Sequence, residues 1–156
     1  MEIVTTRNGT RGARGTKAMM WVMKLMRRRL INQHRKQGDT FRGMKVLYLT
    51  AIGAKSGEPR TTPLAYFPDG DGWLVIASAG GSARHPAWYY NVAKHPDQVS
   101  IEVGGEQIPV TAEQLEGERR AEVWTRVVAE APGFAEYEAK TDRVIPVIRL
   151  TRTPAG

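Results

Sequence analysis

The sequence predicts an α+β fold in which mostly antiparallel strands form a small β-barrel and the helices lie at its ends. Five to seven short segments alternate polar residues with β-branched or aromatic ones, which is the pattern of half-buried strands. Glycine-bearing turns join several of them at hairpin spacing, and only a few helical segments interrupt the run. With 156 residues, 41% of them hydrophobic, the chain suits one domain with its own hydrophobic core.

The N-terminal part of the chain reads as a polar tail followed by an amphipathic helix. Residues 1–15 are rich in Arg, Gly and Thr, and we expect a mobile basic tail unless other parts of the chain tether it. From Thr16, a suitable N-cap, to Gln37, apolar residues recur at helical spacing. They are Met19, Val22, Met23, Met26 and Leu30. We therefore predict a helix over residues 16–37 within a single domain over residues 16–156.

Charge is distributed unevenly along the chain, whose formal net charge is +7. The Lys and Arg residues are concentrated in residues 1–45, whereas residues 46–156 are slightly acidic. A basic amphipathic helix either packs its apolar stripe on the protein's own barrel or lies at the surface of an anionic membrane, and both interpretations stay open. Lys24 interrupts the apolar run too early for a transmembrane span. No nucleic-acid-binding motif accompanies the charge, so no nucleic acid is expected as a partner.

The remaining elements follow in a regular order. We predict strands at residues 44–50, 61–67, 73–78, 98–103, 106–111 and 144–150, and helices at residues 86–95, 115–131 and 134–140. A turn over residues 68–72 joins the second strand to the third, and Gly104-Gly105 joins the fourth to the fifth. Pro146 predicts that the last strand lies at an edge or a bulge, because proline cannot donate a ladder hydrogen bond.

The motifs exclude or disfavour several classes of enzyme. The absence of cysteine removes disulfides, thiolate nucleophiles and cysteine-ligated metals. The three histidines, His34, His85 and His95, have no partners at metal-ligand spacing, so no metal site is expected. The stretch from Gly53 to Gly57 does not meet the spacing of a phosphate loop. Neither a dinucleotide-binding glycine fingerprint nor the nucleophile elbow of a serine hydrolase is present.

A cationic cluster remains that is suited to binding an anion. Lys55, Ser56, Arg60, Thr61 and Thr62 lie within eight residues of one another. Two cations, several hydroxyls and the N–H groups of a turn together suit a phosphate or a carboxylate. A solvated basic hairpin loop has the same composition, so this alternative stays open.

An aromatic cluster opens the helix predicted over residues 86–95. Trp88, Tyr89 and Tyr90 are consecutive, and three consecutive side chains on a helix cannot share one face. We expect at least one of them in the core and another beside a pocket. A cationic loop together with an aromatic helix suits an anionic, flat, aromatic ligand.

Three stretches resemble the deazaflavin-dependent nitroreductase family of actinobacteria, which uses coenzyme F-420 and includes quinone and enone reductases. They are GAKSGEPRTTPL, IASAGGSARHPAWYYNVAKHP and FAEYEAKTDRVIPVIRL, and the similarity runs from about Gly43 to about Arg149. The resemblance implies a split β-barrel like that of FMN-binding proteins, with a groove for reduced F-420. Lys55, Ser56 and Arg60 would hold the phosphate and oligoglutamate tail of the cofactor. The other implied cofactor-binding residues are Ala54, Thr61, Thr62, Pro63, Leu64, Ala65, Ile76, Ala77, Ser78, Ala79, Ala87, Trp88, Tyr89, Tyr90 and Asn91.

The resemblance also implies a substrate pocket, lined by Ala65, Tyr66, Phe134 and Tyr137. Ala65 and Ala131 stand where a nitroimidazole-activating member of the family has tyrosines, so this pocket should be roomier and less polar. We expect quinones and activated alkenes, including enones and coumarin-like lactones, to be better acceptors than bicyclic nitroimidazoles. Ser78 and Tyr137 are the implied catalytic residues, because either hydroxyl can donate a hydrogen bond and a proton to the reduced acceptor.

These inferences describe a cytoplasmic monomer that reduces small molecules, with peripheral membrane contact at the inner face of the cell membrane left open. Two other functions also stay open. One is an FMN-type split-barrel oxidoreductase, which the absorbance of the bound cofactor would distinguish. The other is a non-catalytic, membrane-associated protein that binds the cofactor.

Overall fold

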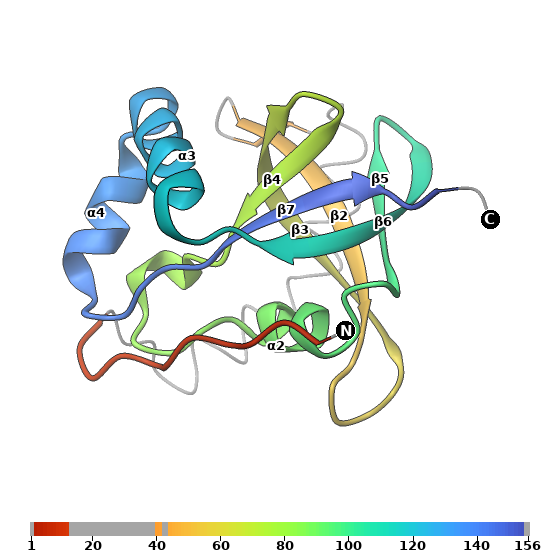
Figure 1. Cartoon of the computed structure of the whole chain (residues 1–156), viewed down its shortest axis with the longest axis horizontal. Coiled ribbons are helices and arrows are strands. Elements are labelled where there is room, and N and C mark those ends of the chain that lie inside the picture. The colour runs from red at the N-terminus through yellow and green to blue at the C-terminus, as the bar shows by residue number, and fades with distance from the viewer. Residues whose placement is uncertain (1, 13–39, 42–43, 155–156) are drawn as a thin grey trace.

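Six antiparallel strands close into a β-barrel at the centre of the structure, a computed structural model that describes residues 2–12, 40–41 and 44–154 (Figure 1). The strands are β2 (Met44–Ile52), β3 (Pro59–Asp69), β4 (Gly72–Ile76), β5 (Val99–Val103), β6 (Glu106–Gln114) and β7 (Val147–Arg152). Their order is β2-β3-β4-β7-β6-β5, and β5 pairs with β2 to close the barrel. A short strand, β1 (Thr40–Phe41), pairs with the start of β2. The predicted α+β barrel is confirmed.

The interior of the barrel is filled by alternate residues of its strands, as the two-residue period of a strand requires. Leu47, Leu49 and Ala51 of β2 are buried there together with apolar residues from the other strands. Helix α2 (Ala87–Lys94) adds Trp88 and Tyr89 to the same core. Burial of a large apolar side chain contributes about 1.5–3 kcal/mol, so this core is the main source of the barrel's stability.

Two helices cover one outer side of the barrel (Figure 1). Helix α3 (Gly117–Glu130) and helix α4 (Gly133–Lys140) are separated at Pro132, whose ring cannot continue the first helix. Between these helices and the barrel lies a second apolar cluster. Its buried members are Phe67, Leu74, Ile76, Leu115, Val127, Phe134, Ile145 and Val147. This second cluster fixes α4 against the strands and thereby positions the residues that α4 carries.

The last strand differs from its prediction in its place in the sheet. The short β1 was not predicted, whereas the other strands and helices named above overlap their predicted ranges. Strand β7 begins at Val147 and lies between β4 and β6, so the expectation of an edge or bulge was wrong. Pro146 precedes the first paired residue, and the strand therefore loses no ladder donor. The Pro146 carbonyl still accepts a hydrogen bond of 3.0 Å from the N–H of Ala77, just beyond β4.

Residues 2–12 form an extended segment that runs past α2 toward α4, and we call it the N-terminal strap (Figure 1). The N–H of Ile3 donates to the Ala93 carbonyl at 2.8 Å, and the N–H of Thr10 donates to the Asp142 carboxylate at 2.8 Å. Mobility was expected for an untethered tail, but residues 2–12 are tethered. The helix predicted over residues 16–37 lies outside the described residues. No helix in the described part of the chain is long and apolar enough to cross a membrane.

Candidate active site

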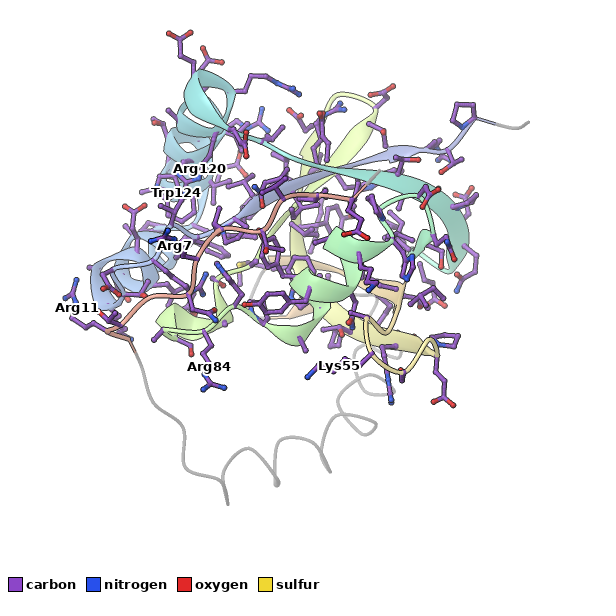
Figure 2. The ribbon with its side chains drawn as sticks, turned by 60° about the horizontal axis from the view of Figure 1, so that its bottom comes forward. Arg7, Arg11, Lys55, Arg84, Arg120 and Trp124 are labelled. Carbon is purple, nitrogen blue, oxygen red and sulfur yellow. The ribbon has the colours of Figure 1, made fainter. Side chains whose placement is uncertain are left out.

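The cationic cluster of the sequence lies in the hairpin loop between β2 and β3. Gly57 has a φ of 72° there, and its N–H donates to the Gly53 carbonyl at 2.9 Å, so the loop is a closed turn. Lys55 and Ser56 are exposed in it. The Lys55 side chain projects toward solvent (Figure 2), and none of the described residues forms an ion pair with it. Its exposed ammonium group is of the kind that attracts an anionic ligand.

One hydrogen bond joins this loop to helix α2. The N–H of Ala54 donates to Asn91 Oδ1 at 2.9 Å, so the structure brings together two predicted cofactor-binding residues that are 37 positions apart. The guanidinium of Arg60, the second residue of β3, lies 3.9 Å from the Glu58 carboxylate. Both side chains are more than half exposed, at 55% and 73%, and such a pair contributes little. The predicted tail-binding residues thus share one end of the barrel.

Strand β3 presents its two faces to different surroundings. The register turns Thr62 and Leu64 toward the barrel interior, while residues 61, 63 and 65 turn outward. Tyr66 packs against the barrel core, on the face opposite to Ala65. One flat ligand therefore cannot meet the side chains of both Ala65 and Tyr66 from the same face.

The segment after β4 forms a wall beside α4, which we define as residues 78–82. Ile76 and Ala77 just before it are buried in the two cores, so their side chains are not accessible to a ligand. Ser78 is half-buried and leads into a short 3-10 turn, η1 (Ala79–Gly81). Ala79 has a φ of 46°, the one positive value at a non-glycine residue in the described part of the chain. Such backbone costs about 1–3 kcal/mol and persists only where its surroundings hold it.

Gly81 brings the wall against α4. A β-carbon on Gly81 would lie 2.9 Å from the Tyr137 carbonyl oxygen, so only glycine allows this approach. The half-buried Tyr137 ring meets Phe134 edge to face with centroids 5.6 Å apart, and Phe134 meets Phe67 at 5.8 Å. The two predicted catalytic residues, Ser78 and Tyr137, therefore belong to segments that are in direct contact.

The aromatic residues of α2 divide between the core and the surface. Trp88 is 7% exposed and Tyr89 is fully buried, so core packing applies to both. The Tyr89 hydroxyl donates to Gln114 at 2.5 Å, whereas the half-buried Tyr90 donates to Asn8 of the strap at 2.9 Å. Contact between Trp88 and the cofactor stays a prediction. Only the narrow exposed edge of the Trp88 ring could make that contact. Ala87, at the start of the helix, is exposed.

Arg143 organises the wall, and the sequence analysis did not single it out. This side chain is 4% exposed, and its guanidinium donates to the carbonyl oxygens of Ala77, Ser78 and Ser82 at 3.0, 2.6 and 2.7 Å. Burial lowers the pKa of the Arg143 guanidinium from its ordinary value, yet an arginine in a protein stays protonated. No sequence pattern marks a buried arginine. The available signal was its position in the third stretch that resembles the family.

His85 connects the wall to the strap. Its Nδ1 lies 3.0 Å from Arg143 Nη1, which can only donate, so Nδ1 accepts and Nε2 carries the proton. Nε2 lies 3.0 Å from the Thr6 carbonyl oxygen and 3.1 Å from that of Arg7. Burial, and secondarily the charge of Arg143, lowers the pKa of the His85 ring, which favours the neutral form. Among the described residues, no group of three or more potential ligands could hold a metal ion.

Four exposed cationic side chains come from the segments that form this region, and all are labelled in Figure 2. Arg7 and Arg11 lie on the strap, Arg84 follows the wall, and Lys55 lies in the hairpin loop. These cations come from segments that are far apart in the sequence, so the local sequence shows this positive charge only in part.

Comparison with known proteins agrees with the geometry. The model of the family described as F420H(2)-dependent quinone reductase matches residues 22–152. A relative of that name from Mycobacterium tuberculosis, Rv1261c, is 43% identical over 110 residues, covering 68% of this chain and 72% of its own. A solved structure described as an F420-H2 dependent reductase (FDR-A) is 42% identical with a TM-score of 0.61, covering 67% of this chain and 92% of that one. Another, described as a domain-swapped dimer, is 36% identical with a TM-score of 0.62, covering 86% and 99%.

The closed antiparallel barrel, with its cationic loop and adjoining wall, defines an oxidoreductase of the split-barrel class, and the predicted split β-barrel is confirmed. Within that class the chain belongs to the F420H(2)-dependent quinone reductase family. Reduced coenzyme F-420 is accordingly its cofactor, and the predicted enzyme class and cofactor are confirmed. The monomeric state stays a prediction.

The residues present fit this cofactor. Lys55 and Arg60 offer two accessible cations at one end of the barrel, as a tail of phosphate and carboxylates requires. Ala79 and Gly80 are exposed, and a β-carbon on Gly80 would meet no atom within 4 Å, so open space lies beside the wall. A planar ring can approach backbone of this kind closely.

Proposed function

We propose that this chain reduces quinones, and also activated alkenes and nitro compounds, in the region between the hairpin loop, the wall and α4. The observation that carries the proposal is the direct contact between the wall and α4, which joins the segments of Ser78 and Tyr137. Membership in the family supports a quinone as the acceptor. Enones and nitro compounds resemble quinones in having an electron-poor centre conjugated to oxygen, and the small Ala65 and Ala131 leave room for them.

The residues of the cationic end hold the cofactor in this proposal. Lys55, Ser56 and Arg60 bind the charged tail, and Asn91 fixes the loop through the N–H of Ala54. The outward face of residues 61–65 and the exposed backbone at Ala79 lie along the ring and the ribityl chain. Ala87 and Tyr90 close the site from α2, with the exposed edge of Trp88 beside them. Tyr66, which packs on the other face of β3, supports this arrangement from the core side.

The reaction is a hydride transfer followed by a protonation. Bound reduced F-420 supplies the hydride. A quinone that has accepted a hydride carries a negative charge on oxygen and needs one proton to become a hydroquinone. The Ser78 or Tyr137 hydroxyl donates a hydrogen bond to that oxygen, gives up the proton and regains one from water. The ring of Phe134, packed against Tyr137, orients the tyrosine and excludes water from one side.

The proposal is tested by mixing the protein with reduced F-420 and an acceptor. We expect the absorbance of oxidised F-420 to return with menadione, cyclohexenone or nitrobenzene, and F-420 to bind with micromolar affinity or better. An FMN-type oxidoreductase would instead bind FMN tightly and F-420 not at all. A non-catalytic carrier would bind F-420 without turnover.

The tail site has its own test, in the double variant Lys55→Ala/Arg60→Ala. Each lost charge-assisted hydrogen bond weakens F-420 binding by about 1.5–3 kcal/mol. The control is Arg119→Ala/Arg152→Ala, which removes the same charge from exposed ion pairs with Glu113 and Glu106. Equal F-420 affinity in the two double variants would mean that the tail binds elsewhere.

We further propose that the cationic side of the molecule contacts anionic membrane, at the inner face of the cell membrane. The exposed side chains of Arg7, Arg11, Lys55 and Arg84 favour this contact, and apolar quinones dissolve in membranes. The test is co-sedimentation with vesicles that contain phosphatidylglycerol, using Arg7→Gln/Arg84→Gln. Truncation of the N-terminus is unsuitable, because it would also remove the strap. Binding should fall in this variant and at high salt, but should be unchanged in Arg119→Gln/Arg152→Gln. Equal sedimentation of both variants would contradict the proposal.

A further inference from the structure

Arg143 lies between α4 and β7 and forms hydrogen bonds with the backbone at both ends of the wall. Its Nη1 and Nη2 donate to the Ala77 and Ser78 carbonyls at 3.0 and 2.6 Å, and its Nε donates to the Ser82 carbonyl at 2.7 Å. A guanidinium is planar and presents its donors in a fixed fork. The three hydrogen bonds therefore set the separation between the two ends of the wall. A side chain with a single donor nitrogen, such as lysine, cannot do this.

The charge on Arg143 is buried without a carboxylate partner in the described part of the chain. Arg143 is 4% exposed, and the other hydrogen-bond partner of its guanidinium is the neutral His85 ring at 3.0 Å. The adjacent Asp142 is turned to the strap, where it accepts from the N–H groups of Thr10 and Arg11 at 2.8 and 2.9 Å. Burying an unpaired cation is unfavourable, and an apolar side chain would fill the same space without that cost. Space filling alone does not account for an arginine here.

The wall that Arg143 grips has a strained backbone. Ala79, Gly80 and Gly81 have successive positive φ values of 46°, 63° and 83°. Left-handed backbone at a non-glycine residue persists only where neighbouring contacts hold it, and it clusters at functional sites. Here the fork holds both ends of the strained run while Ala79 stays exposed between them. The shape of the exposed surface thus depends on a side chain beneath it.

The strap supports the wall from a second direction. The N–H of Gly9 donates to the Ala83 carbonyl at 2.7 Å. A β-carbon on Gly12 would lie 2.6 Å from the Gly81 carbonyl oxygen, so the strap lies directly on the wall's backbone. His85 links the strap to Arg143 through its two ring nitrogens. Contacts and hydrogen bonds therefore join the wall, the strap and the guanidinium into one unit.

We propose that Arg143 is a positioning residue for hydride transfer, which fixes the backbone of residues 78–82 in the shape that the cofactor ring requires. The inference rests on the proposed function, since it assigns the wall to the ring. Arg143 touches neither cofactor nor acceptor and acts through the carbonyls that it binds. Loss of the fork should misplace the ring against the acceptor while the cationic tail site stays intact.

The first test is amide hydrogen exchange in the protein without cofactor, so its result does not depend on activity. Arg143→Lys keeps the charge and loses the fork, whereas Arg143→Met removes both. We expect amides of residues 78–83 to exchange at least about tenfold faster in both variants, with β5 and β6 unchanged. The control is Arg149→Met, which removes a partly buried arginine that pairs with Asp69 at 2.7 Å, and it should leave the wall's exchange as in the wild type.

The second test separates turnover from binding. In both Arg143 variants we expect kcat with menadione to fall about tenfold or more, because small displacements of reacting atoms have large effects on rate. The Kd for F-420 should change less than about threefold, because Lys55 and Arg60 are untouched. Arg149→Met should keep kcat within about threefold of the wild type.

The outcomes are distinct. Unchanged exchange of the wall, or a wild-type kcat despite faster exchange, overturns the role of Arg143. Lack of turnover by the wild type with any acceptor refutes the proposed function instead, and the exchange experiment still decides whether Arg143 holds the wall. If neither Arg143 variant folds, Gly12→Ala decides, because its β-carbon would lie 2.6 Å from the Gly81 carbonyl oxygen, so the contact between strap and wall must change while Arg143 is kept. Faster exchange of residues 78–83 in this variant would show that the wall has moved. Wild-type kcat in that variant would overturn the inference.

Discussion

Asn91 Oδ1 accepts a hydrogen bond of 2.9 Å from the N–H of Ala54, so helix α2 directly holds the loop that carries Lys55 and Ser56. We predict that Asn91→Ala weakens F-420 binding by about three- to tenfold and lowers the free energy of unfolding by about 1 kcal/mol, the net value of one hydrogen bond. Fluorescence titration and urea unfolding measure the two effects. Gln107→Ala, which removes an exposed hydrogen bond to Glu102, is the control. Equal F-420 affinity in the two variants would contradict the role of Asn91.

The hydroxyls of Ser78 and Tyr137 are predicted to act in protonation of the acceptor. We expect Ser78→Ala or Tyr137→Phe to lower kcat for menadione about 10- to 100-fold, with a nearly unchanged Kd for F-420. Steady-state kinetics at saturating reduced F-420 would show which hydroxyl matters more. Thr111→Val, which removes a hydroxyl bonded to Thr153 outside the proposed site, is the control. Full activity in both Ser78→Ala and Tyr137→Phe would leave water as the proton source.

Gly81 allows the wall to approach α4, and this close approach can be tested by adding one methyl group. In Gly81→Ala the new β-carbon meets the Tyr137 carbonyl oxygen at 2.9 Å and Lys140 Cβ at 3.0 Å, on backbone with a φ of 83°. We predict a loss of about 2–4 kcal/mol, combining the left-handed backbone with overpacking. Gly104→Ala has a similar positive φ of 57° in open space and should lose only about 1–2 kcal/mol. Urea midpoints that fail to separate the two variants would contradict the contact.

The environment of His85 leads us to predict that the free energy of unfolding falls on mild acidification. Burial lowers the pKa of His85 below its ordinary value of 6.5, so the unfolded chain binds this proton at a higher pH than the folded protein. Stability should therefore be complete above pH 6.5 and should fall as the pH drops below that value. His85→Gln should flatten this dependence in urea unfolding measured between pH 7.5 and 5, whereas His95→Gln should keep it. A wild-type slope in His85→Gln would assign the effect to another group.

The ion pairs of Asp69 lead us to predict a second loss of stability at more acidic pH. The hydrogen bond from Arg149, at 2.7 Å, and that from Arg126, at 2.9 Å, lower the pKa of its carboxyl below the ordinary 3.8. The folded state thus gives up this proton more readily, and the stabilisation is present above pH 3.8 and lost below it. Near pH 7, Asp69→Asn should cost about 1–2 kcal/mol, against less than about 0.5 for the exposed Glu106→Gln. The difference between Asp69→Asn and the wild type should vanish in strong acid.

Local patterns predicted the strands and hairpins, because the alternation of residues such as Leu47, Leu49 and Ala51 encodes one buried face. They predicted a barrel but not which two strands close it, because the pairing of β2 with β5, such as Leu49 with Ile101, joins residues far apart in the sequence. The prediction from Pro146 was wrong because the paired residues of β7 begin one position later, at Val147, and a proline just before a strand removes no ladder hydrogen bond.

Some residues of the candidate site could be predicted from the sequence, and others could not. The cationic loop is contiguous in sequence, so Lys55, Ser56 and Arg60 were visible as a cluster. Arg143 and His85 were not, because their contacts with residues 6–7 and 77–82 span long separations, and a buried cation has no local signature. The tethering of the strap was missed for the same reason. Family resemblance supplied Tyr137, whose approach to the wall depends on Gly81 in another part of the chain.

The pairing of β5 with β2 affects how the protein behaves when concentrated or heated. Each of the six barrel strands has a neighbour on both sides, so the ring offers no long open edge on which a strand of another molecule could add. Substitutions at Ser100 or Glu102 that loosen this seam should promote β-rich aggregates before they alter enzyme activity, because they would free the backbone of two strands at once.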